Sequence, residues 1–268
     1  MKLDGRVAIV TGGASGIGSA LAAAAVAARA RVVVADLDAG GAERAAAALG
    51  DGALAWGCDV TDEAALRDLI EAAERELGPV DVFFANAGIA NGPGLGRSEG
   101  EWTRAIDVNL MAHVRAATLL VPRWLERGGG YFVATASAAG LLTQVGSAPY
   151  AVTKHAAVAF AEWLSVTYGD RGIRVSCICP MGVRTPMLDG GLGAEGPDED
   201  LAVRTVAAAG AVLEPEVVAA QTLAAIAEER FLVLPHPEVL EYFRRKGADY
   251  ERWLRGMRRL QAEVDGNE

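Results

Sequence analysis

Val-Ala-Ile-Val-Thr-Gly-Gly-Ala-Ser-Gly-Ile-Gly, at residues 7–18, is the stretch that decides the fold. Its first five residues form a β-branched run typical of a buried strand, and an alanine-rich helix is expected over residues 16–29. Glycines in such a turn let the backbone approach a pyrophosphate, to which the helix N-terminus presents amides and a partial positive charge. The turn lacks the Gly-Lys-Ser/Thr of a P-loop. It therefore predicts a dinucleotide site that includes Gly12, Ser15, Gly16, Ile17 and Gly18.

Strand-like and helix-like segments alternate along the rest of the chain. Further strands are expected over residues 31–36, 53–58, 80–85, 131–136, 173–178 and 231–234. Helices are expected over 39–49, 62–77 with Thr61 as its N-cap, 101–126, 148–168 and 214–229, and residues 180–213 are expected to be a loop. Strands that alternate with helices form a parallel sheet covered on both faces. We therefore predict a doubly wound α/β Rossmann fold with a seven-stranded parallel sheet over residues 1–236. Residues 237–268 would be a C-terminal helical extension rather than an independent domain.

Composition and charge narrow the classes of partner. The net charge of -10 and the pI near 4.9 argue against nucleic acid, because binding to a phosphate backbone requires a basic face. Residues 19–28, the longest uncharged apolar stretch near the start, are too short to cross a bilayer. Residues 1–4 are charged and lack an apolar signal region. We therefore expect a cytoplasmic protein with neither a nucleic-acid nor a membrane partner.

The cysteines and histidines indicate neither a disulfide framework nor a metal site. There are three of each, and they lack the spacing of a metal-ligand set. The cysteines are interpreted as reduced core thiols, because two of them alternate along an expected strand and point to one face of it. The histidines are interpreted as packing or surface residues. These residues are Cys58, Cys177, Cys179, His113, His155 and His236.

Asp36 ends the second expected strand, eighteen residues beyond Gly18. A carboxylate there can accept hydrogen bonds from the hydroxyls of an adenosine ribose and would repel a 2′-phosphate. The next residue is Leu37, and the glycine-rich turn contains no Arg or Lys that could compensate a phosphate. The spacing favours NAD over NADP, with a capping Asp at a strand end as the alternative.

Three polar residues carry the strongest indication of chemistry. Tyr150 and Lys154 stand four apart on one face of an expected helix, and Ser137 lies thirteen residues before Tyr150, at the end of the fifth strand. A Tyr with a pKa near 10 is a poor base at neutral pH, but an ammonium beside it lowers that pKa. A Ser hydroxyl can donate to an oxygen that develops negative charge. A surface pair is the usual explanation of Tyr and Lys at this spacing. In a chain that also has the dinucleotide turn, the trio predicts that Tyr150 is an acid/base with an apparent pKa well below 10.

In combination, these motifs resemble the short-chain dehydrogenase/reductase family over residues 5–235. The family's TGxxxGxG turn corresponds to residues 11–18, its adenine-contacting Asp-Val pair to Asp59 and Val60, and its Asn-Ala-Gly after the fourth strand to Asn86, Ala87 and Gly88. The resemblance implies a further catalytic residue, Asn109, which would hold a water that links Lys154 to solvent. It also implies that Ser137 polarises the substrate carbonyl and that Lys154 binds the nicotinamide ribose.

The family's Pro-Gly-x-x-x-Thr segment, which holds the nicotinamide carboxamide, corresponds to Pro180 and Thr185, with Gly182 and Val183 between them. Met181 stands where the Gly usually is, so the shape of the local backbone and pocket stays open. Apolar residues in the segments expected near the nicotinamide indicate a hydrophobic secondary alcohol or ketone. The substrate candidates are Ala139, Leu141, Gln144, Met181 and Met187.

Two further features concern assembly. The expected helical stretches over residues 105–121 and 156–164 are apolar around most of their circumference and need cover on more than one side. With the family resemblance, this predicts a homo-oligomer, a tetramer or a dimer, with an unusually buried helix within a monomer as the alternative. Apolar residues recur at helical spacing beyond the seventh strand, and Gly247 separates two pieces. Residues 237–268 should form two short helices, packed through Trp253 and Leu254 over the substrate opening or onto a neighbouring subunit.

The sequence thus predicts an NAD-dependent short-chain dehydrogenase/reductase that acts on CH–OH groups. One alternative from another class is a regulatory protein that binds NAD without turnover, although such a protein would be free to lose Tyr150 or Lys154. A related-fold epimerase or dehydratase is a further alternative, but those proteins usually carry a larger substrate domain.

Overall fold

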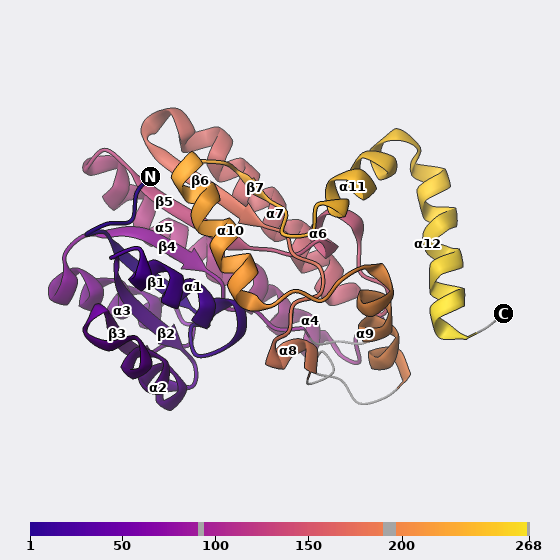
Figure 1. Cartoon of the computed structure of the whole chain (residues 1–268), viewed down its shortest axis with the longest axis horizontal. Helices are drawn as coiled ribbons and strands as arrows, with labels where there is room; N and C mark the ends of the chain where they lie inside the picture. Colours follow the sequence, from indigo (N-terminus) through magenta and orange to yellow (C-terminus); the bar gives the residue numbers. More distant parts are fainter. Residues whose placement is uncertain (91–93, 190–196, 267–268) are drawn as a thin grey trace.

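The structure is a computed structural model that describes residues 1–90, 94–189 and 197–266. In these residues seven parallel strands form one sheet in the order β3-β2-β1-β4-β5-β6-β7 (Figure 1). The strands are β1 (Val7–Thr11), β2 (Arg31–Asp36), β3 (Ala53–Gly57), β4 (Val80–Ala85), β5 (Gly130–Thr135), β6 (Ile173–Ile178) and β7 (Leu232–Val233). The predicted doubly wound α/β fold is confirmed.

Long helices cover both faces of the sheet. One face carries α1 (Gly16–Ala27), α2 (Ala39–Leu49) and α10 (Pro215–Glu228), and the other carries α3 (Glu63–Leu77), α5 (Ala112–Glu126) and α7 (Ala148–Tyr168). Side chains alternate along each strand, so Ile9 of β1 packs in the cluster with α3, α5 and α7 while Val10 packs in the cluster with α1 and α10. A strand buried on both faces must be apolar throughout, which explains the continuous Val, Ile, Phe and Ala runs.

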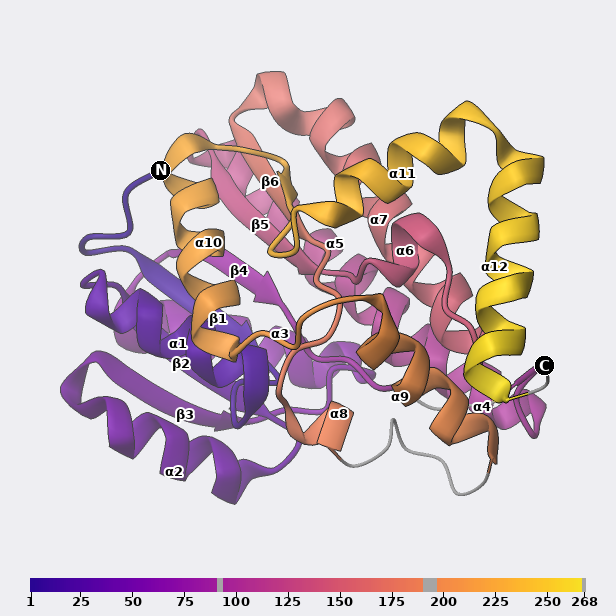
Figure 2. The same ribbon diagram turned by 45° about the vertical axis from the view of Figure 1, so that its right-hand side comes forward.

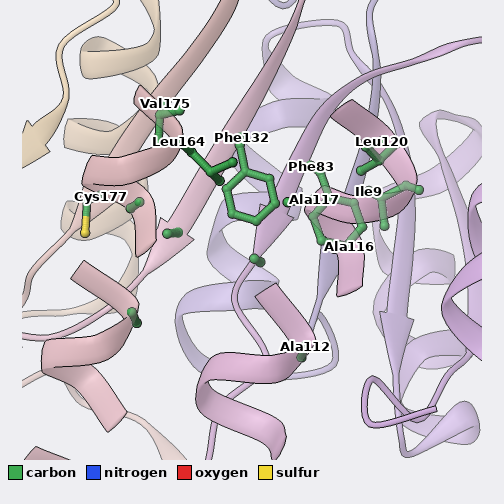
Figure 3. Close-up of a cluster of buried hydrophobic side chains, with 14 of the residues drawn as sticks. Ile9, Phe83, Ala112, Ala116, Ala117, Leu120, Phe132, Leu164, Val175 and Cys177 are labelled. Carbon is green, nitrogen blue, oxygen red and sulfur yellow. The ribbon is translucent and has the colours of Figure 1, made fainter. Parts of the chain in front are cut away.

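The larger of the two core clusters lies between the sheet and helices α5 and α7 (Figure 3). Phe83 of β4 and Phe132 of β5 stack there, with ring centroids 6.0 Å apart. Ala112 and Ala116 of α5 face the two rings, and their small side chains let the helix approach the sheet. Burying one Phe ring contributes roughly 1.5–3 kcal/mol. This core fixes the carboxyl ends of β4 and β5, from which the polar site residues follow.

The strand order reverses between β1 and β4, because the chain first builds outward to β3 and then returns to the other side of β1. In doubly wound sheets a crevice opens at such a switch point, beyond the carboxyl ends of the strands. The glycine-rich turn after β1 and the Asn-Ala-Gly segment after β4 therefore lie side by side.

Several boundaries differ from the sequence-based expectation. Asp62, not Thr61, is the N-cap of α3, because its side chain accepts the backbone N–H of Ala64. The helix expected over 101–126 consists of α4 (Glu99–Ile106), a π-helical turn (Asp107–Met111) and α5. The loop expected over 180–213 contains α8 (Pro186–Asp189) and α9 (Pro197–Ala209), and residues 190–196 lie outside the described residues. Shorter elements are α6 (Ala139–Leu142) and the 3-10 turns Gly50–Gly52 and Gly169–Arg171.

The C-terminal extension forms the two expected helices, α11 (Glu238–Ala248) and α12 (Tyr250–Asp265), which project from the sheet layers at the end of the molecule that carries α9 (Figure 1). Residues 267–268 lie outside the described part. Trp253 is half-buried and packs against the larger core cluster, whereas Leu254 is 39% exposed. Only the first of the two expected anchors therefore packs on this chain. In the described segments no helix has the length and apolar character needed to cross a membrane.

Candidate active site

A cavity of about 1080 Å³ lies at the carboxyl ends of the strands. Small-molecule sites typically have about 300–1,000 Å³, so this one has room for a dinucleotide together with a substrate. All of the sequence-predicted cofactor residues line it. They are Gly12, Ser15, Gly16, Ile17, Gly18, Asp36, Leu37, Asp59, Val60, Asn86, Ala87, Gly88, Tyr150, Lys154, Pro180, Gly182, Val183 and Thr185.

The glycine-rich turn has a shape that admits no larger side chains. Gly12 has a φ of +63°, in the left-handed region, and a Cβ on Gly18 would collide with the carbonyl of Gly12. The Thr11 hydroxyl accepts the backbone N–H groups of Asn86 (3.1 Å) and Ala87 (3.2 Å). The Asn86 side chain donates in turn to the carbonyls of Thr11 (3.0 Å) and Gly12 (3.2 Å). These bonds fix the turn against the loop after β4 and keep its backbone open to a pyrophosphate.

The Asp36 carboxylate is oriented by two backbone amides at one end of the cavity. Its Oδ2 accepts from the N–H of Ala14 (3.0 Å) and its Oδ1 from the N–H of Asp38 (3.1 Å). Each oxygen keeps a lone pair for a further donor. Leu37 and residues 58–61, which line the cavity beside it, include no Lys or Arg. This end of the cavity can therefore accept ribose hydroxyls, and it offers no cation to a phosphate.

The structure brings Ser137, Tyr150 and Lys154 together at the other end. Ser147 caps α7 by accepting the N–H of Tyr150 (3.4 Å), which places Tyr150 in the first turn and Lys154 one turn later. The Lys154 Nζ lies 5.7 Å from the centre of the Tyr150 ring and donates to the carbonyl of Thr135 (3.0 Å). The Ser137 hydroxyl shares a hydrogen bond with the Tyr150 phenol. A proton acceptor, a cation and a hydroxyl donor thus border one part of the cavity.

Burial governs the protonation of both titratable groups. It lowers the pKa of Lys154 to about 8, because the ammonium has lost its water. Burial also raises the pKa of Tyr150 above its ordinary value, and the hydrogen bond with Ser137 opposes that rise. The expected apparent pKa well below 10 concerns the working enzyme with its cofactor bound, and it stays a prediction. The ammonium of Lys154, directed toward the Thr135 carbonyl, does not offset the loss of solvent around the phenol.

Asn109 is fully buried behind the site and does not line the cavity. It lies in the π-helical turn, where its amide nitrogen donates to the Ile89 carbonyl (2.9 Å) and the Thr153 hydroxyl (3.1 Å). Its Oδ1 accepts the N–H of Ile89 (2.8 Å). Both amide donors are used, so only an oxygen lone pair or the backbone could hold the water expected here. A Cβ on Gly88 would lie 3.3 Å from this Oδ1 and 3.4 Å from the Lys154 Nζ, so Gly88 leaves open the space between the two groups.

The substrate candidates are divided by the structure. Four of them line the cavity, namely Ala139, Gln144, Met181 and Met187. Leu141 does not, and this expectation is corrected: its side chain packs in the core, and Leu142 lines the cavity instead. Neighbouring residues of a helix face different directions, which the sequence of α6 does not resolve. Met181 keeps its place through its N–H, which donates to Nδ1 of the buried His236 (3.1 Å).

Sequence reasoning missed two parts of the cavity wall, which come from α4 and α9. The α9 segment follows a stretch rich in Gly and Pro, which concealed the helix. The missed residues include Gly100, Thr103, Arg104, Thr205, Val206 and Ala208. The C-terminal helices were expected over the substrate opening or on a neighbouring subunit, and in the structure Trp253, Met257 and Leu260 line the cavity.

Comparison with known proteins bears directly on this site. Residues 6–191 match the family model described as short chain dehydrogenase. The chain belongs to this family. The match covers the glycine-rich turn, the strand ends and the Ser–Tyr–Lys trio. It confirms the predicted family and the predicted enzyme class, an oxidoreductase that acts on alcohols.

Relatives of this short-chain dehydrogenase share most of its length. The 1-deoxy-11-beta-hydroxypentalenate dehydrogenase of Streptomyces exfoliatus is 40% identical over 221 residues, which are 80% of each chain. The D-threitol dehydrogenase of Mycolicibacterium smegmatis is 35% identical over 223 residues, 82% of this chain and 85% of its own. A short chain dehydrogenase/reductase from Burkholderia phymatum, solved in complex with NAD, has a TM-score of 0.85 at 31% identity. The similarity covers 94% of this chain and 96% of that one.

Proposed function

We propose that this short-chain dehydrogenase transfers a hydride between NAD and a hydrophobic secondary alcohol or ketone, with Tyr150 as the acid/base. The observation that carries the proposal is the meeting of Ser137, Tyr150 and Lys154 in one cavity with Asp36. Oxidation of an alcohol requires a proton acceptor next to its hydroxyl, and Tyr150 at the cavity wall would act as that acceptor in its phenolate form.

The three residues would divide the work of proton transfer. Tyr150 accepts the hydroxyl proton during oxidation and returns it during reduction. Ser137 donates a hydrogen bond to the substrate oxygen, where negative charge develops. Lys154 favours the phenolate by its positive charge and would bind the nicotinamide ribose. Bound NAD supplies the hydride acceptor, and the positive charge of its oxidised ring favours the phenolate as well.

The choice of NAD over NADP rests on Asp36. Its carboxylate keeps lone pairs for ribose hydroxyls, and the cavity wall beside it carries no cation for a 2′-phosphate. The similar Burkholderia phymatum structure is also a complex with NAD. The family resemblance suggests the roles of the remaining cofactor residues: the glycine-rich turn at the pyrophosphate, Asp59 and Val60 at the adenine, and Thr185 at the carboxamide.

The character of the substrate is proposed from the cavity wall. The two curated relatives are named for a hydroxypentalenate and for threitol, so their names do not agree on one kind of alcohol. Apolar side chains of the segments expected near the nicotinamide line the cavity, among them Leu142, Val145, Met181 and Met187, with Thr143 and Gln144 as polar neighbours. An apolar wall offers few partners for the hydroxyls of a polyol, which would lose water without compensation. A hydrophobic secondary alcohol fits it better.

The test is formation of reduced cofactor by the purified chain with a panel of alicyclic secondary alcohols, linear secondary alcohols and polyols. NADH should form with the apolar alcohols and NADPH much more slowly. Asp36→Ala should weaken the preference for NAD, about tenfold, because a charged acceptor for the ribose is lost. Faster reduction of NADP by the wild type would overturn the cofactor choice, and turnover of polyols alone would overturn the substrate class.

A homo-oligomer, a tetramer or a dimer, belongs to the same proposal. The outward face of α7 leaves Val152, Trp163 and Val166 exposed at 51%, 54% and 86%, which is the uncovered apolar surface expected of an interface. A cytoplasmic location is also proposed. It is supported by three free cysteines, all of them buried, which fit a reducing compartment.

A further inference from the structure

Lys246 of α11 is buried, with 8% of its surface exposed, although Lys is ordinarily a surface residue. Its Nζ donates to the carbonyl of Leu141 at 2.7 Å and lies 3.5 Å from Nε2 of His155. The ring of Tyr250 lies on it as well, with its centre 5.6 Å from the Nζ. A side chain of the C-terminal extension is thus inserted between α6 and α7.

The contact with His155 fixes the donor roles. An ammonium can only donate, so Nε2 of His155 acts as the acceptor and Nδ1 carries the proton. Nδ1 then donates to the carbonyl of Ala151 (2.8 Å), one turn earlier in α7. At 3.5 Å the contact with Lys246 is weak, and the bond to Leu141 dominates. His155 directly follows Lys154 in α7, so Lys246 contacts the helix that carries the proposed catalytic residues.

The Leu141 carbonyl belongs to a turn with unusual backbone geometry. Thr143, which follows α6, has φ +103° and ψ 168°, a conformation almost restricted to glycine. Such strain persists only where the surrounding contacts fix the backbone. Carbonyls in the last turn of a helix lack intrahelical donors, and Lys246 supplies one to Leu141. Thr143 and Gln144 line the cavity, so the shape of this turn is part of the substrate wall.

The helices that Lys246 fastens form another part of that wall. Trp253, Met257 and Leu260 of α12 line the cavity together with Tyr242 of α11. The α12 helix lies along α9 (Figure 2), and none of its residues is fully buried. Trp253 and the contact with α9 hold α12 only in part, so its place in the cavity wall also depends on the attachment of α11.

We propose that Lys246 is a positioning residue for substrate binding. From α11 it holds the strained turn at Thr143 and the α12 wall in place, and so determines the affinity for the alcohol without touching it. The proposal rests on the proposed function for its kinetic readout. It is independent of the choice between NAD and NADP, because Asp36, on which that choice rests, lies at the other end of the cavity.

The kinetic test compares Lys246→Met with Arg244→Met in the full-length protein. Arg244 is an exposed cation on the same helix, so its replacement removes the same charge without disturbing the turn. For Lys246→Met the KM for the alcohol should rise about tenfold, because a hydrogen bond from a charged donor is lost. The kcat at saturation and the Kd for NAD should stay within about twofold of the wild type. An unchanged KM, or an equal rise in Arg244→Met, would overturn the proposal.

A double-mutant cycle asks whether Lys246 acts through α12. In a Trp253→Ala background, where the wall is already impaired, Lys246→Met should raise KM much less than in the wild type. If the fold-change in KM of the double variant equals the product of the fold-changes of the two single variants, Lys246 and Trp253 act independently. That result would contradict the proposal that Lys246 acts through α12.

Hydrogen exchange tests the attachment without any turnover. Amides of residues 141–143 and of α12 should exchange at least about tenfold faster in Lys246→Met, while those of β1 and β4 stay protected. Unchanged exchange refutes the positioning role even in an active enzyme. A wild type that turns over no alcohol refutes the proposed function instead, and the exchange result still decides the role of Lys246. If Lys246→Met does not fold, Lys246→Gln takes its place, because Gln keeps a shorter hydrogen-bond donor. The KM for the alcohol and the exchange rates of the same amides should then rise by smaller factors.

Discussion

Two walls of one cavity are built in different ways. The cofactor wall consists of turns that leave buried central strands, and the Thr11 hydroxyl and the Asn86 amide tie those turns to one another. The outer substrate wall consists of α9, α11 and α12, outside the sheet layers, and α12 has no fully buried residue. The cofactor wall is thus fixed by the core that also determines the fold. The substrate wall depends on a few contacts, such as that of Lys246, and can change without damage to the core.

The largest expected effect comes from the residue on which the chemistry depends. Tyr150→Phe keeps the ring and removes the acid/base, so turnover should fall by about 10²–10⁴-fold while NAD affinity, measured by fluorescence titration, persists. Lys154→Ala is the matched contrast, since loss of its ammonium should reduce both turnover and NAD affinity. Substantial turnover by Tyr150→Phe would show that another group carries the proton, and the mechanism would be wrong.

The next prediction compares how much a side chain of the sheet and a side chain of the outer wall contribute to the free energy of unfolding. Phe132 is completely buried, so Phe132→Ala should lower the free energy of unfolding by about 3–5 kcal/mol. Leu254 is 39% exposed, so Leu254→Ala should change the free energy of unfolding by no more than about 0.5 kcal/mol. Urea unfolding of both variants measures the difference. Similar losses in the two would show that α12 belongs to the core or to a subunit interface.

Acid should weaken the core behind the cofactor wall through His113. Burial, and then the charge of Lys154, lower its pKa from 6.5 to about 3, and neither ring nitrogen has a hydrogen-bond partner among the described residues. Between these two values the unfolded chain binds a proton that the folded chain does not. Stability is therefore lost as pH falls below about 6.5, by up to about 1.4 kcal/mol per pH unit. His113→Leu should remove this part of the slope in urea unfolding from about pH 7 to 4, and an unchanged slope would contradict the assignment.

The smallest expected effect concerns removal of the outer wall itself. Deletion of residues 249–268 takes away α12, with Trp253, Met257 and Leu260, but leaves Lys246 in α11. The KM for the alcohol should rise at least about tenfold, as in Lys246→Met, because apolar contacts worth about 1.5–3 kcal/mol for a fully buried side chain are lost in part. NAD affinity should change little. If KM and oligomer size, measured by light scattering, both stay the same, the extension has no part in the substrate wall.

Local patterns in the sequence predicted most of the fold and the centre of the site. The helix expected over 148–168 has those bounds in the structure, and its spacing alone places Tyr150 and Lys154 on one face. Short apolar runs, most of them rich in β-branched or aromatic residues, identified every strand to within about one or two residues at each end. Such features depend on neighbours in the chain, so they can be derived from the order of residues.

Only the tertiary structure decided what depends on burial and on distant contacts. The orientation of Leu141 and Leu142, and the direction in which the pKa of Tyr150 shifts, follow from what surrounds each group in space. The bond from Lys246 to Leu141 joins residues 105 positions apart, and no local pattern connects them. The sequence by itself therefore determined the fold, the cofactor turn and the reactive trio, because their spacing is local. The outer wall of the substrate site required the folded chain, because a free energy of contact exists only where folding brings the partners together.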